Sequence, residues 1–204
     1  MNIEDFKKAL EIIKANESII IHRHNNPDGD ALGSQVGLLH IIKENYPEKS
    51  VYIVGDESER YGFIPNRIMD TVDDSLFSSS LSIILDTSSP SLISDDRWKN
   101  AKESLRFDHH LFIEKIADYE VVDSTYESCC GLVADFAKTL GLKVNDNAAK
   151  ALYTGLVTDS GRFLYDSVSS RTHTIAAFLL ERSFDRNDIF RNLYVEDLES
   201  VKRK

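Results

Sequence analysis

The sequence predicts an α/β fold in which a mostly parallel, five-stranded sheet carries helices on both faces. Short β-branched and aliphatic runs alternate along the chain with longer stretches of helical periodicity, and this alternation is typical of parallel sheets. Several of the apolar runs lead directly into Asp and His residues. Because the carboxyl ends of parallel strands meet at one edge of a sheet, the same pattern predicts where a site is built.

The expected strands are short apolar runs. They are residues 19–22, 51–54, 81–85, 105–107 and 119–122. The expected helices repeat apolar residues every three or four positions, as Phe6, Leu10 and Ile13 do in the first of them. They are residues 3–15, 31–45, 131–140, 147–158 and 172–181. Residues 56–74 have a weak pattern that Gly62 interrupts, so we expect a loop and a short helix there.

Length, composition and charge limit the classes of protein. A chain of 204 residues with 42% hydrophobic residues can bury a core, as one domain or as a domain with an extension. No segment resembles a signal peptide or a membrane span, which predicts a cytoplasmic protein with no membrane partner. Cys129 and Cys130 are adjacent and cannot form an ordinary disulfide framework, which suits a reducing compartment. A net charge of −10 argues against a track for long nucleic acids but allows a short anionic substrate held through metal ions.

The turn after the first expected strand concentrates ionisable side chains. His24, Asp28 and Asp30 lie within seven residues, where a strand hands over to a helix. Neighbouring carboxylates repel one another unless protons or metal ions neutralise them. An alternative needs no metal, because Asn-Pro-Asp-Gly is a strong turn signal and Asp30 could be the N-cap of the following helix.

Similar residues recur at later strand ends and at one helix end. The full set is His24, Asp28, Asp30, Asp86, Asp108, His109, His110 and Asp159. A carboxylate-rich set with some imidazole suits Mn²⁺ or Mg²⁺ better than Zn²⁺, and five carboxylates carry more charge than one divalent ion offsets. Two metal ions that activate a shared water would suit hydrolysis of a phosphoester or phosphoanhydride.

Each of these later residues also has a local alternative. Asp86 could cap a turn, the His109-His110 pair could lie in a solvated loop, and Asp159 could simply end a helix. Arg162 could be a surface ion-pair partner. All of these alternatives must hold together for the site to be absent, so the combined pattern favours a metal site.

Four motifs, in this order and spacing, resemble the DHH phosphoesterase superfamily. They are His24-x-Asn-Pro-Asp28-Gly-Asp30, the strand-end Asp86, Asp108-His109-His110, and Asp159-Ser160-Gly161-Arg162. The resemblance covers residues 19–185, nearly the whole chain. The continuation Ala31-Leu32-Gly33-Ser34 is similar to the branch of nanoRNases and pAp phosphatases rather than to family II inorganic pyrophosphatases.

The resemblance implies a role for each matching residue. The implied ligands are His24 and Asp28 for one metal ion, Asp30, His109 and Asp159 for the other, and Asp86 as the bridge between them. His110 is similar to a phosphate-contacting histidine that can donate a hydrogen bond or a proton near the leaving group. Asp108 would orient an imidazole, and Arg162 would contact a phosphate. His110, Asp108 and Arg162 are therefore the expected catalytic residues, with His110 and Arg162 also binding substrate.

The implied activity is metal-dependent hydrolysis of short oligoribonucleotides (nanoRNA), of 3′-phosphoadenosine 5′-phosphate (pAp), or of both. The expected cofactors are two divalent ions, with Mn²⁺ favoured and Mg²⁺ as the alternative, and relatives often pair as homodimers. Alternative activities in the superfamily are inorganic pyrophosphatase and cyclic- or linear-dinucleotide phosphodiesterase. A non-catalytic nucleotide-binding regulatory module is a different class of alternative, although an intact ligand set favours the enzyme. A RecJ-type exonuclease is disfavoured by the acidic chain.

The resemblance also predicts the domain organisation. Residues 1–185 would form the DHH domain, and residues 186–204 would begin an interdomain linker helix. The second, substrate-binding domain of such enzymes is expected to be absent, so the chain should bind Mn²⁺ yet turn over oligonucleotides poorly.

One departure from the family pattern is Ser128-Cys129-Cys130, where relatives tend to have small polar residues. Those cysteines are either buried packing residues or, if they face the site, a source of sensitivity to oxidation.

Overall fold

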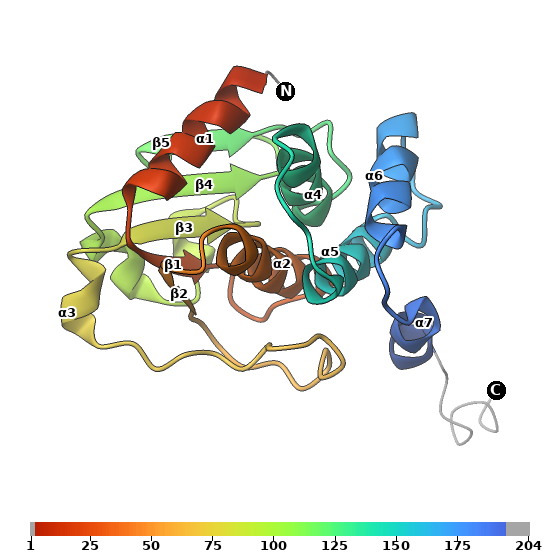
Figure 1. Ribbon diagram of the computed structural model, residues 1–204, viewed down its shortest axis with the longest axis horizontal. Coiled ribbons are helices and arrows are strands. Elements are labelled where there is room, and N and C mark those ends of the chain that lie inside the picture. The colour runs from red at the N-terminus through yellow and green to blue at the C-terminus, as the bar shows by residue number, and fades with distance from the viewer. Residues whose placement is uncertain (1–2, 195–204) are drawn as a thin grey trace.

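The computed structural model describes residues 3–194 and contains one sheet with strand order β2-β1-β3-β4-β5, in which every pairing is parallel (Figure 1). The strands are β1 (Ser18–His22), β2 (Ser50–Ile53), β3 (Leu81–Leu85), β4 (Glu103–Asp108) and β5 (Tyr119–Val122). The helices are α1 (Ile3–Ala15), α2 (Gly29–Asn45), α3 (Asp74–Phe77), α4 (Cys129–Thr139), α5 (Asp146–Asp159), α6 (Ser170–Leu180) and α7 (Arg186–Tyr194). This architecture confirms the fold class that the sequence predicts.

One face of the sheet carries the long helices. In Figure 1, α1, α2 and α4 lie in front of the strands, and α5 and α6 continue outward from α2. Side chains alternate between the faces of a strand, so Ile19 and Ile21 of β1 enter the large core beneath these helices. In that core Phe107 of β4 packs edge to face on Phe136 of α4, and Phe6 of α1 also packs edge to face on Phe136.

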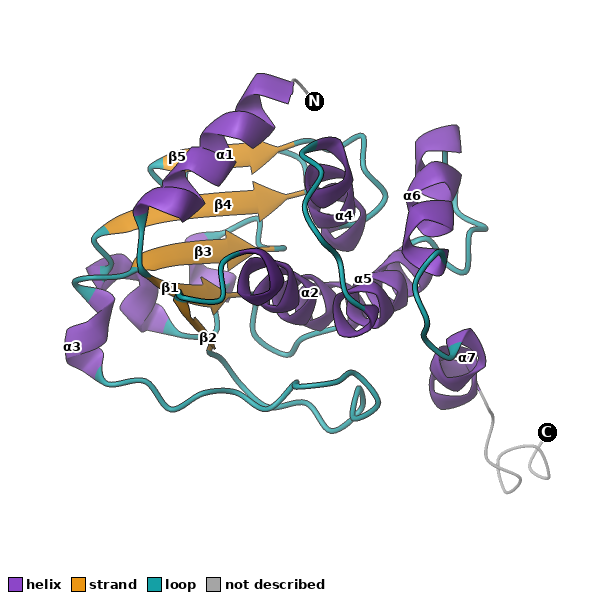
Figure 2. Cartoon of the chain, in the orientation of Figure 1, coloured by secondary structure: helices purple, strands orange, loops and turns teal. Residues whose placement is uncertain are grey.

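The other face has a thinner cover. It consists of α3 and two short 3₁₀ helices, Pro90–Leu92 and Asp96–Asn100, which the sequence did not predict (Figure 2). Ile20 packs there with Phe77 of α3, and Ile84 packs with Ile93. The chain adds β2 on one side of β1 and then adds β3, β4 and β5 on the other side. Because crossovers between parallel strands are right-handed, the connections on the two sides of this point lie on opposite faces of the sheet. Helices therefore cover both faces, but unequally.

Element boundaries differ from the sequence prediction where a side chain caps a helix. Helix α2 begins at Gly29 rather than residue 31, because the Asp28 carboxylate accepts hydrogen bonds from the backbone N–H groups of Asp30 and Ala31. The N-cap is thus Asp28 and not Asp30. Helix α4 begins at Cys129 rather than residue 131, since the Ser128 hydroxyl caps it.

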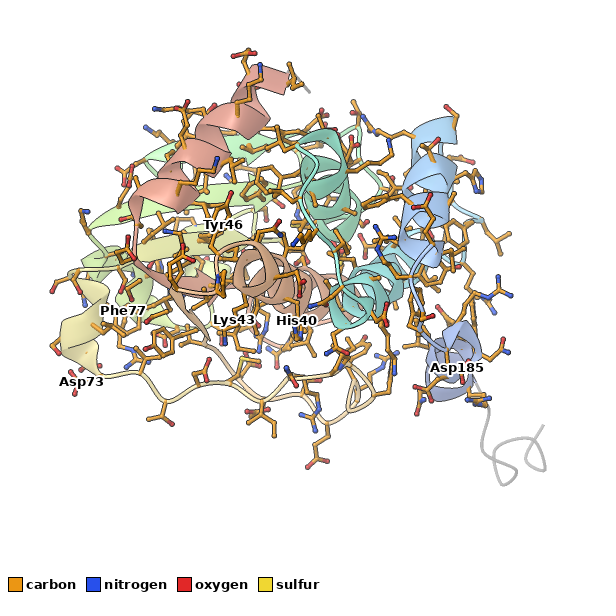
Figure 3. The ribbon with its side chains drawn as sticks, viewed as in Figure 1. His40, Lys43, Tyr46, Asp73, Phe77 and Asp185 are labelled. Carbon is orange, nitrogen blue, oxygen red and sulfur yellow. The ribbon has the colours of Figure 1, made fainter. Side chains whose placement is uncertain are left out.

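The segment between β2 and α3 is a long loop, seen along the bottom of Figure 2. Its short helix is α3, at the end of the expected loop rather than inside it. The loop is tied to the sheet by Arg23, whose fully buried guanidinium donates to the Asp56 carboxylate at 2.8 Å and to the Gln35 amide oxygen at 3.2 Å. His40, which projects from α2 near Lys43 in Figure 3, lies 3.3 Å from the Asn66 amide of the same loop.

Helix α7 occupies the start of the expected interdomain helix 186–204. Residues 195–204 lie outside the described part of the chain, so the domain boundary stays a prediction. Across residues 3–194, the structure contains no helix with the length and apolar content that crossing a membrane requires.

His22 provides a test of the thinner core. Its ring is fully buried against Phe77, and its Nε2 atom lies 3.1 Å from the Ser82 hydroxyl. Burial, only partly offset by attraction to Asp95, lowers the pKa of His22 to about 4. In the unfolded chain His22 becomes protonated below its ordinary pKa of about 6.5, whereas in the folded chain it stays neutral down to about pH 4. Stability from this group is therefore complete above pH 6.5 and decreases as the pH falls to 4, by about 3 kcal/mol.

The measurement is urea unfolding from pH 7 to pH 4 of the wild type and of His22→Gln, which cannot titrate. We expect the wild type to lose about 3 kcal/mol more than the variant over this range. Parallel pH profiles for the two proteins would show that His22 does not titrate abnormally.

Candidate metal centre

The carboxyl ends of the strands deliver most of the ionisable side chains that the sequence singles out. His24 follows β1, Asp86 follows β3, and Asp108 ends β4 directly before His109 and His110. The N-terminus of α2 adds Asp28 and Asp30, and the last residue of α5 adds Asp159. The site thus lies beside the reversal point between β1 and β3, where ligand sites of open α/β sheets are usually found.

Seven of these side chains form three overlapping groups. Within each group the ligand atoms lie within 4.8 Å of one another. The groups are His24, Asp28 and Asp86; Asp30, His109 and Asp159; and Asp86, His109 and His110. The eighth residue, Asp108, contacts the cluster through His110.

His24 faces two carboxylates with one ring nitrogen. Its Nε2 atom is 3.5 Å from Oδ2 of Asp86 and 3.8 Å from Oδ1 of Asp28. Its Nδ1 atom is 2.7 Å from the carbonyl oxygen of Asn25. A carbonyl oxygen only accepts hydrogen bonds, so Nδ1 carries the proton and Nε2 can offer its lone pair, as in most metal-binding histidines.

His109 faces three carboxylates. Its Nε2 atom is 3.4 Å from Oδ1 of Asp86, 3.4 Å from Oδ2 of Asp159 and 3.7 Å from Oδ2 of Asp30. The two oxygens of Asp86 therefore face different histidines, with Oδ2 toward His24 and Oδ1 toward His109.

Asp86 is a constrained residue. Its side chain is almost fully buried, and its backbone has φ = +51°, a left-handed conformation that non-glycine residues adopt rarely and at a cost. Its Oδ1 atom has no hydrogen-bond partner among the residues that the structure describes. A buried carboxylate oxygen without a donor is costly, and a cation at this position would remove the cost.

Asp30 is held by helix α4. Its fully buried carboxylate accepts hydrogen bonds from the backbone N–H groups of Cys129, at 2.6 Å, and Cys130, at 2.8 Å. Unpaired N–H groups at a helix N-terminus favour an anion, so α4 orients this carboxylate and partly offsets its charge. Burial, and then the nearby charges of Asp86 and Asp159, still raise the pKa of Asp30 well above its usual value.

The other pKa values describe a cluster in need of positive charge. Burial lowers the pKa of each histidine, but hydrogen bonds to Asp28 and Asp86 raise that of His24 to about 10, and contacts with Asp86 and Asp30 raise that of His109 to about 10. Burial raises the pKa of Asp159 to about 6. Without metal, protons on these groups compensate the carboxylates, and divalent ions would supply the same compensation.

The donor set fits divalent ions that prefer oxygen. The facing atoms are carboxylate oxygens and imidazole nitrogens. Both neighbouring thiols are buried and point to backbone carbonyls, Cys129 to Phe107 and Cys130 to Asp30. Burial raises the pKa of both thiols, so they act as packing residues and not as thiolate ligands. This donor set suits Mn²⁺ or Mg²⁺.

A buried ion pair between Arg106 and Asp108 holds the ring of His110 in place. The Arg106 guanidinium lies 2.5 Å from Oδ2 of Asp108, and both side chains are fully buried. The other oxygen of Asp108 accepts a hydrogen bond from Nδ1–H of His110 at 2.7 Å. This hydrogen bond is the main cause that raises the pKa of His110, and it leaves Nε2 free to meet a ligand. Arg106 was not singled out from the sequence, because a charged residue inside an apolar strand carries no local signal of its partner.

A close contact between helices α2 and α5 was also missed from the sequence. Gly29, Gly33 and Gly37 repeat every fourth residue on one side of α2. A Cβ atom on Gly33 would lie 2.5 Å from the carbonyl oxygen of Ala151 in α5. Because the two backbones touch, Asp30 at the start of α2 comes within reach of Asp159 at the end of α5. The four-residue glycine repeat was the available signal.

Gly155 of α5 allows a test of this packing. A Cβ atom there would lie 2.2 Å from Sγ of Cys130 and 2.8 Å from Oδ1 of Asp30. We expect Gly155→Ala to destabilise the protein by about 1–3 kcal/mol and, by displacing Asp30, to weaken Mn²⁺ binding about tenfold or more. The control is Gly62→Ala, whose Cβ atom would come no closer than 3.3 Å to its nearest neighbour. Equal unfolding midpoints and equal calorimetric affinities for the two variants would contradict the expectation.

Arg162 lies next to the cluster but outside the three groups. It lines a pocket of about 440 Å³ that Asp28 and Asp159 also line, and its guanidinium stacks 4.7 Å from the ring centre of Tyr194. The structure therefore brings Arg162 to the edge of the site, without a direct contact to a proposed ligand among the described residues.

Comparisons with known proteins place the chain among its relatives. A family model described as "DHH family, N-terminal domain" matches residues 18–156. The chain is 41% identical over 180 residues to the probable bifunctional oligoribonuclease and PAP phosphatase NrnA of Streptococcus mutans, covering 88% of this chain and 57% of that protein. It is 33% identical over 198 residues to the bifunctional oligoribonuclease and PAP phosphatase NrnA of Bacillus subtilis, covering 96% and 63%.

Solved structures share the fold of this chain. An exopolyphosphatase-related protein from Bacteroides fragilis matches with a TM-score of 0.88 at 25% identity, covering 99% of this chain and 63% of that one. A putative family II inorganic pyrophosphatase from Methanococcus jannaschii shares the fold, with a TM-score of 0.59 at 18% identity over 80% of this chain and 54% of that one. The chain spans about three fifths of the length of the two NrnA relatives, 57% and 63%. The family match covers well over half of the 204 residues, so the resemblance that the sequence predicts is confirmed: this chain belongs to the DHH family.

Proposed function

We propose that this chain carries the metal-binding part of a phosphoesterase that hydrolyses short oligoribonucleotides, 3′-phosphoadenosine 5′-phosphate, or both. The relatives named as bifunctional oligoribonucleases and PAP phosphatases support the substrate class. The observation that carries the proposal is the position of Asp86, whose two oxygens face His24 on one side and His109 on the other. A buried carboxylate shared in this way suits the bridge of a two-metal site.

We propose ligands for two metal ions that share Asp86. They are His24 and Asp28 for one ion, Asp30, His109 and Asp159 for the other, and Asp86 for both. When bound, two divalent ions lower the pKa of a shared water and offset charge on the phosphoryl oxygens. Mn²⁺ is the ion that we propose, with Mg²⁺ as the alternative, because both accept mixed oxygen and imidazole ligands.

The remaining work of the site falls to side chains around the cluster. His110 presents Nε2 toward the reacting phosphate, where its proton can be donated to the leaving oxygen. Asp108 holds the ring of His110 in place and keeps the proton on Nδ1. Arg162 binds a non-bridging phosphate oxygen, for which a guanidinium is well suited.

The test is product release from 3′-phosphoadenosine 5′-phosphate and from the dinucleotide pApA, each with Mn²⁺, with Mg²⁺ and with a chelator. We expect AMP from both substrates only when a divalent ion is present. Loss of this release in Asp86→Asn, with the fold retained by circular dichroism, would support the proposed centre. Release of AMP that a chelator leaves unchanged would overturn it.

Two alternatives remain, and the assay separates them when pyrophosphate is added as a third substrate. An inorganic pyrophosphatase would hydrolyse pyrophosphate faster than pApA, and the shared fold with a putative family II enzyme is the observation behind this alternative. A non-catalytic nucleotide-binding module would bind Mn²⁺ and nucleotide without forming product. The filled set of ionisable positions favours the enzyme over the module.

We also propose a cytoplasmic location and a homodimer. Two buried, unpaired cysteine thiols are consistent with a reducing compartment. Sedimentation equilibrium of the purified chain would test the dimer, and a monomer at micromolar concentration would contradict it.

A further inference from the structure

The pocket beside the cluster is large enough for more than a phosphate. Its volume is about 440 Å³, and Asp28 and Asp159 form the wall that it shares with the metal centre. Pockets for small ligands usually measure about 300–1,000 Å³. A phosphate bound at the cluster would therefore have its substituent directed to an adjoining space of nucleoside size.

Two cations line this pocket in a chain that is acidic overall. Arg60 comes from the loop after β2, and Arg162 comes from the turn after α5. Among the described residues neither guanidinium forms an ion pair. Arg60 instead stacks on Tyr61 at 5.4 Å, and Arg162 stacks on Tyr194 at 4.7 Å. Guanidinium groups that lack a carboxylate partner are available to bind phosphate oxygens.

Three tyrosines from distant parts of the sequence complete the lining. They are Tyr61, Tyr165 and Tyr194. Tyr165 is 60% exposed, so its ring is accessible to a ligand in the pocket. Exposed aromatic rings beside cationic groups are the common platform for stacking nucleobases.

The ring of Tyr165 is held in a defined position. Its carbon atoms lie so close to Gly161 that a Cβ atom on this glycine would approach them to 2.4–2.7 Å. The backbone N–H of Tyr165 also bonds to the carbonyl oxygen of Ser160 at 3.1 Å. Contact with the bare glycine backbone holds the ring in place, while more than half of the residue stays exposed. A ring held in this way loses little conformational entropy when a ligand stacks on it.

The turn that carries Arg162 and Tyr165 is strained. Gly161, Arg162 and Phe163 have consecutive left-handed backbones, with φ values of 56°, 61° and 65°. Two of the three are not glycine, and such strain persists only where the surroundings impose it. Phe163 anchors the turn by stacking on His173 at 5.6 Å. The anchored turn presents its neighbouring residues to the pocket.

We propose that this pocket binds the nucleoside attached to the reacting phosphate. The base stacks on Tyr165, and Arg60 binds a second phosphate of the substrate, while Arg162 binds the reacting phosphate. This inference rests on the proposed function and refines it, since it predicts preference for nucleoside phosphates over phosphates that lack a base. Stacking tolerates any base, so the preference is for a nucleotide and not for one sequence.

The test compares two monophosphates that differ only by the base. AMP and ribose 5-phosphate are titrated separately into the Mn²⁺-loaded chain, and dissociation constants are measured by calorimetry. We expect AMP to bind about tenfold more tightly, because stacking of one base on an aromatic ring contributes a factor of about 5 to 150. In Tyr165→Leu this difference should disappear through weaker AMP binding, with ribose 5-phosphate affinity unchanged.

Matched variants separate the ring from the charge. Tyr165→Phe keeps the stacking face and should keep the preference for AMP. Arg60→Gln should weaken the binding of the bisphosphate pAp more than that of AMP, since only pAp carries a second phosphate. If Tyr165→Leu lowered the affinity for both monophosphates equally, the residue would be structural and the inference would fail.

The outcomes distinguish this inference from the proposed function. Equal binding of AMP and ribose 5-phosphate, both dependent on Mn²⁺, would overturn the nucleoside pocket and leave the phosphoesterase proposal standing. If the chain bound no Mn²⁺, or bound neither AMP nor ribose 5-phosphate, the nucleoside pocket and the phosphoesterase proposal would both be overturned.

Discussion

Asp86→Asn is expected to reduce Mn²⁺ affinity by at least about 100-fold and to remove one of two bound equivalents. Loss of a residue that only supports a metal ligand costs about 10- to 100-fold, and Asp86 faces both halves of the cluster. Asparagine keeps the shape of the side chain and tolerates the left-handed backbone at this position, so the change isolates the charge. The measurement is calorimetric titration of the metal-free chain with Mn²⁺.

The matched control is Asp96→Asn. This carboxylate is 84% exposed and pairs with Lys99 on a 3₁₀ helix away from the cluster, so its loss should leave both equivalents and their affinities unchanged. Wild-type stoichiometry and affinity in Asp86→Asn would mean that the aspartates serve turns and caps, and the enzymatic proposal would fall with the metal centre.

Asp108→Asn is expected to destabilise the protein by about 3 kcal/mol, because it removes the nearest charge partner of Arg106 inside the core. Arg106 retains Glu120 at 3.2 Å, which keeps the expected loss near the lower end of the range for broken buried pairs. For a chain of this length the loss corresponds to a melting temperature lower by roughly 6–12 °C. Urea and thermal unfolding of both proteins provide the measurement.

A double variant tests the cause of this loss. Arg106→Met combined with Asp108→Asn removes the buried cation together with its partner, so most of the stability should return. Hydrolysis should not return in the double variant, because His110 still lacks the carboxylate that orients it. A double variant as unstable as Asp108→Asn would show that the unpaired arginine is not the source of the effect.

Local patterns in the sequence were sufficient for the fold class and for the residues of the cluster. The β-branched runs around Ile20 and Ile83 could be assigned to buried parallel strands because period and composition are properties of short segments. Strand ends meet at one edge in such a sheet, so the proximity of His24 and Asp86 followed from topology alone. Four ordered motifs also identified the family, which the family model confirms.

The sequence was less informative where a contact joins distant segments. The backbone amides of Cys129 and Cys130 orient Asp30 from about a hundred residues away, and backbone groups leave no trace in residue identity. The sequence left open whether these cysteines are packing residues or thiols that face the site, and the structure shows buried packing residues whose backbone amides hold Asp30. Boundaries also shifted, since Asp28 rather than Asp30 caps α2.

The sequence by itself thus determined the α/β class, the DHH family and the set of ionisable residues, because each depends on local periodicity or on motif order. Only the tertiary structure decided how that set is divided around Asp86, which side chains support it, and where the pocket lies. Tyr165 and Arg60 lie about a hundred positions apart in the sequence, and no motif there indicates that they belong to one site. They line one pocket because the loop after β2 and the strained turn after α5 lie side by side in the folded chain, and no single segment encodes this packing between elements.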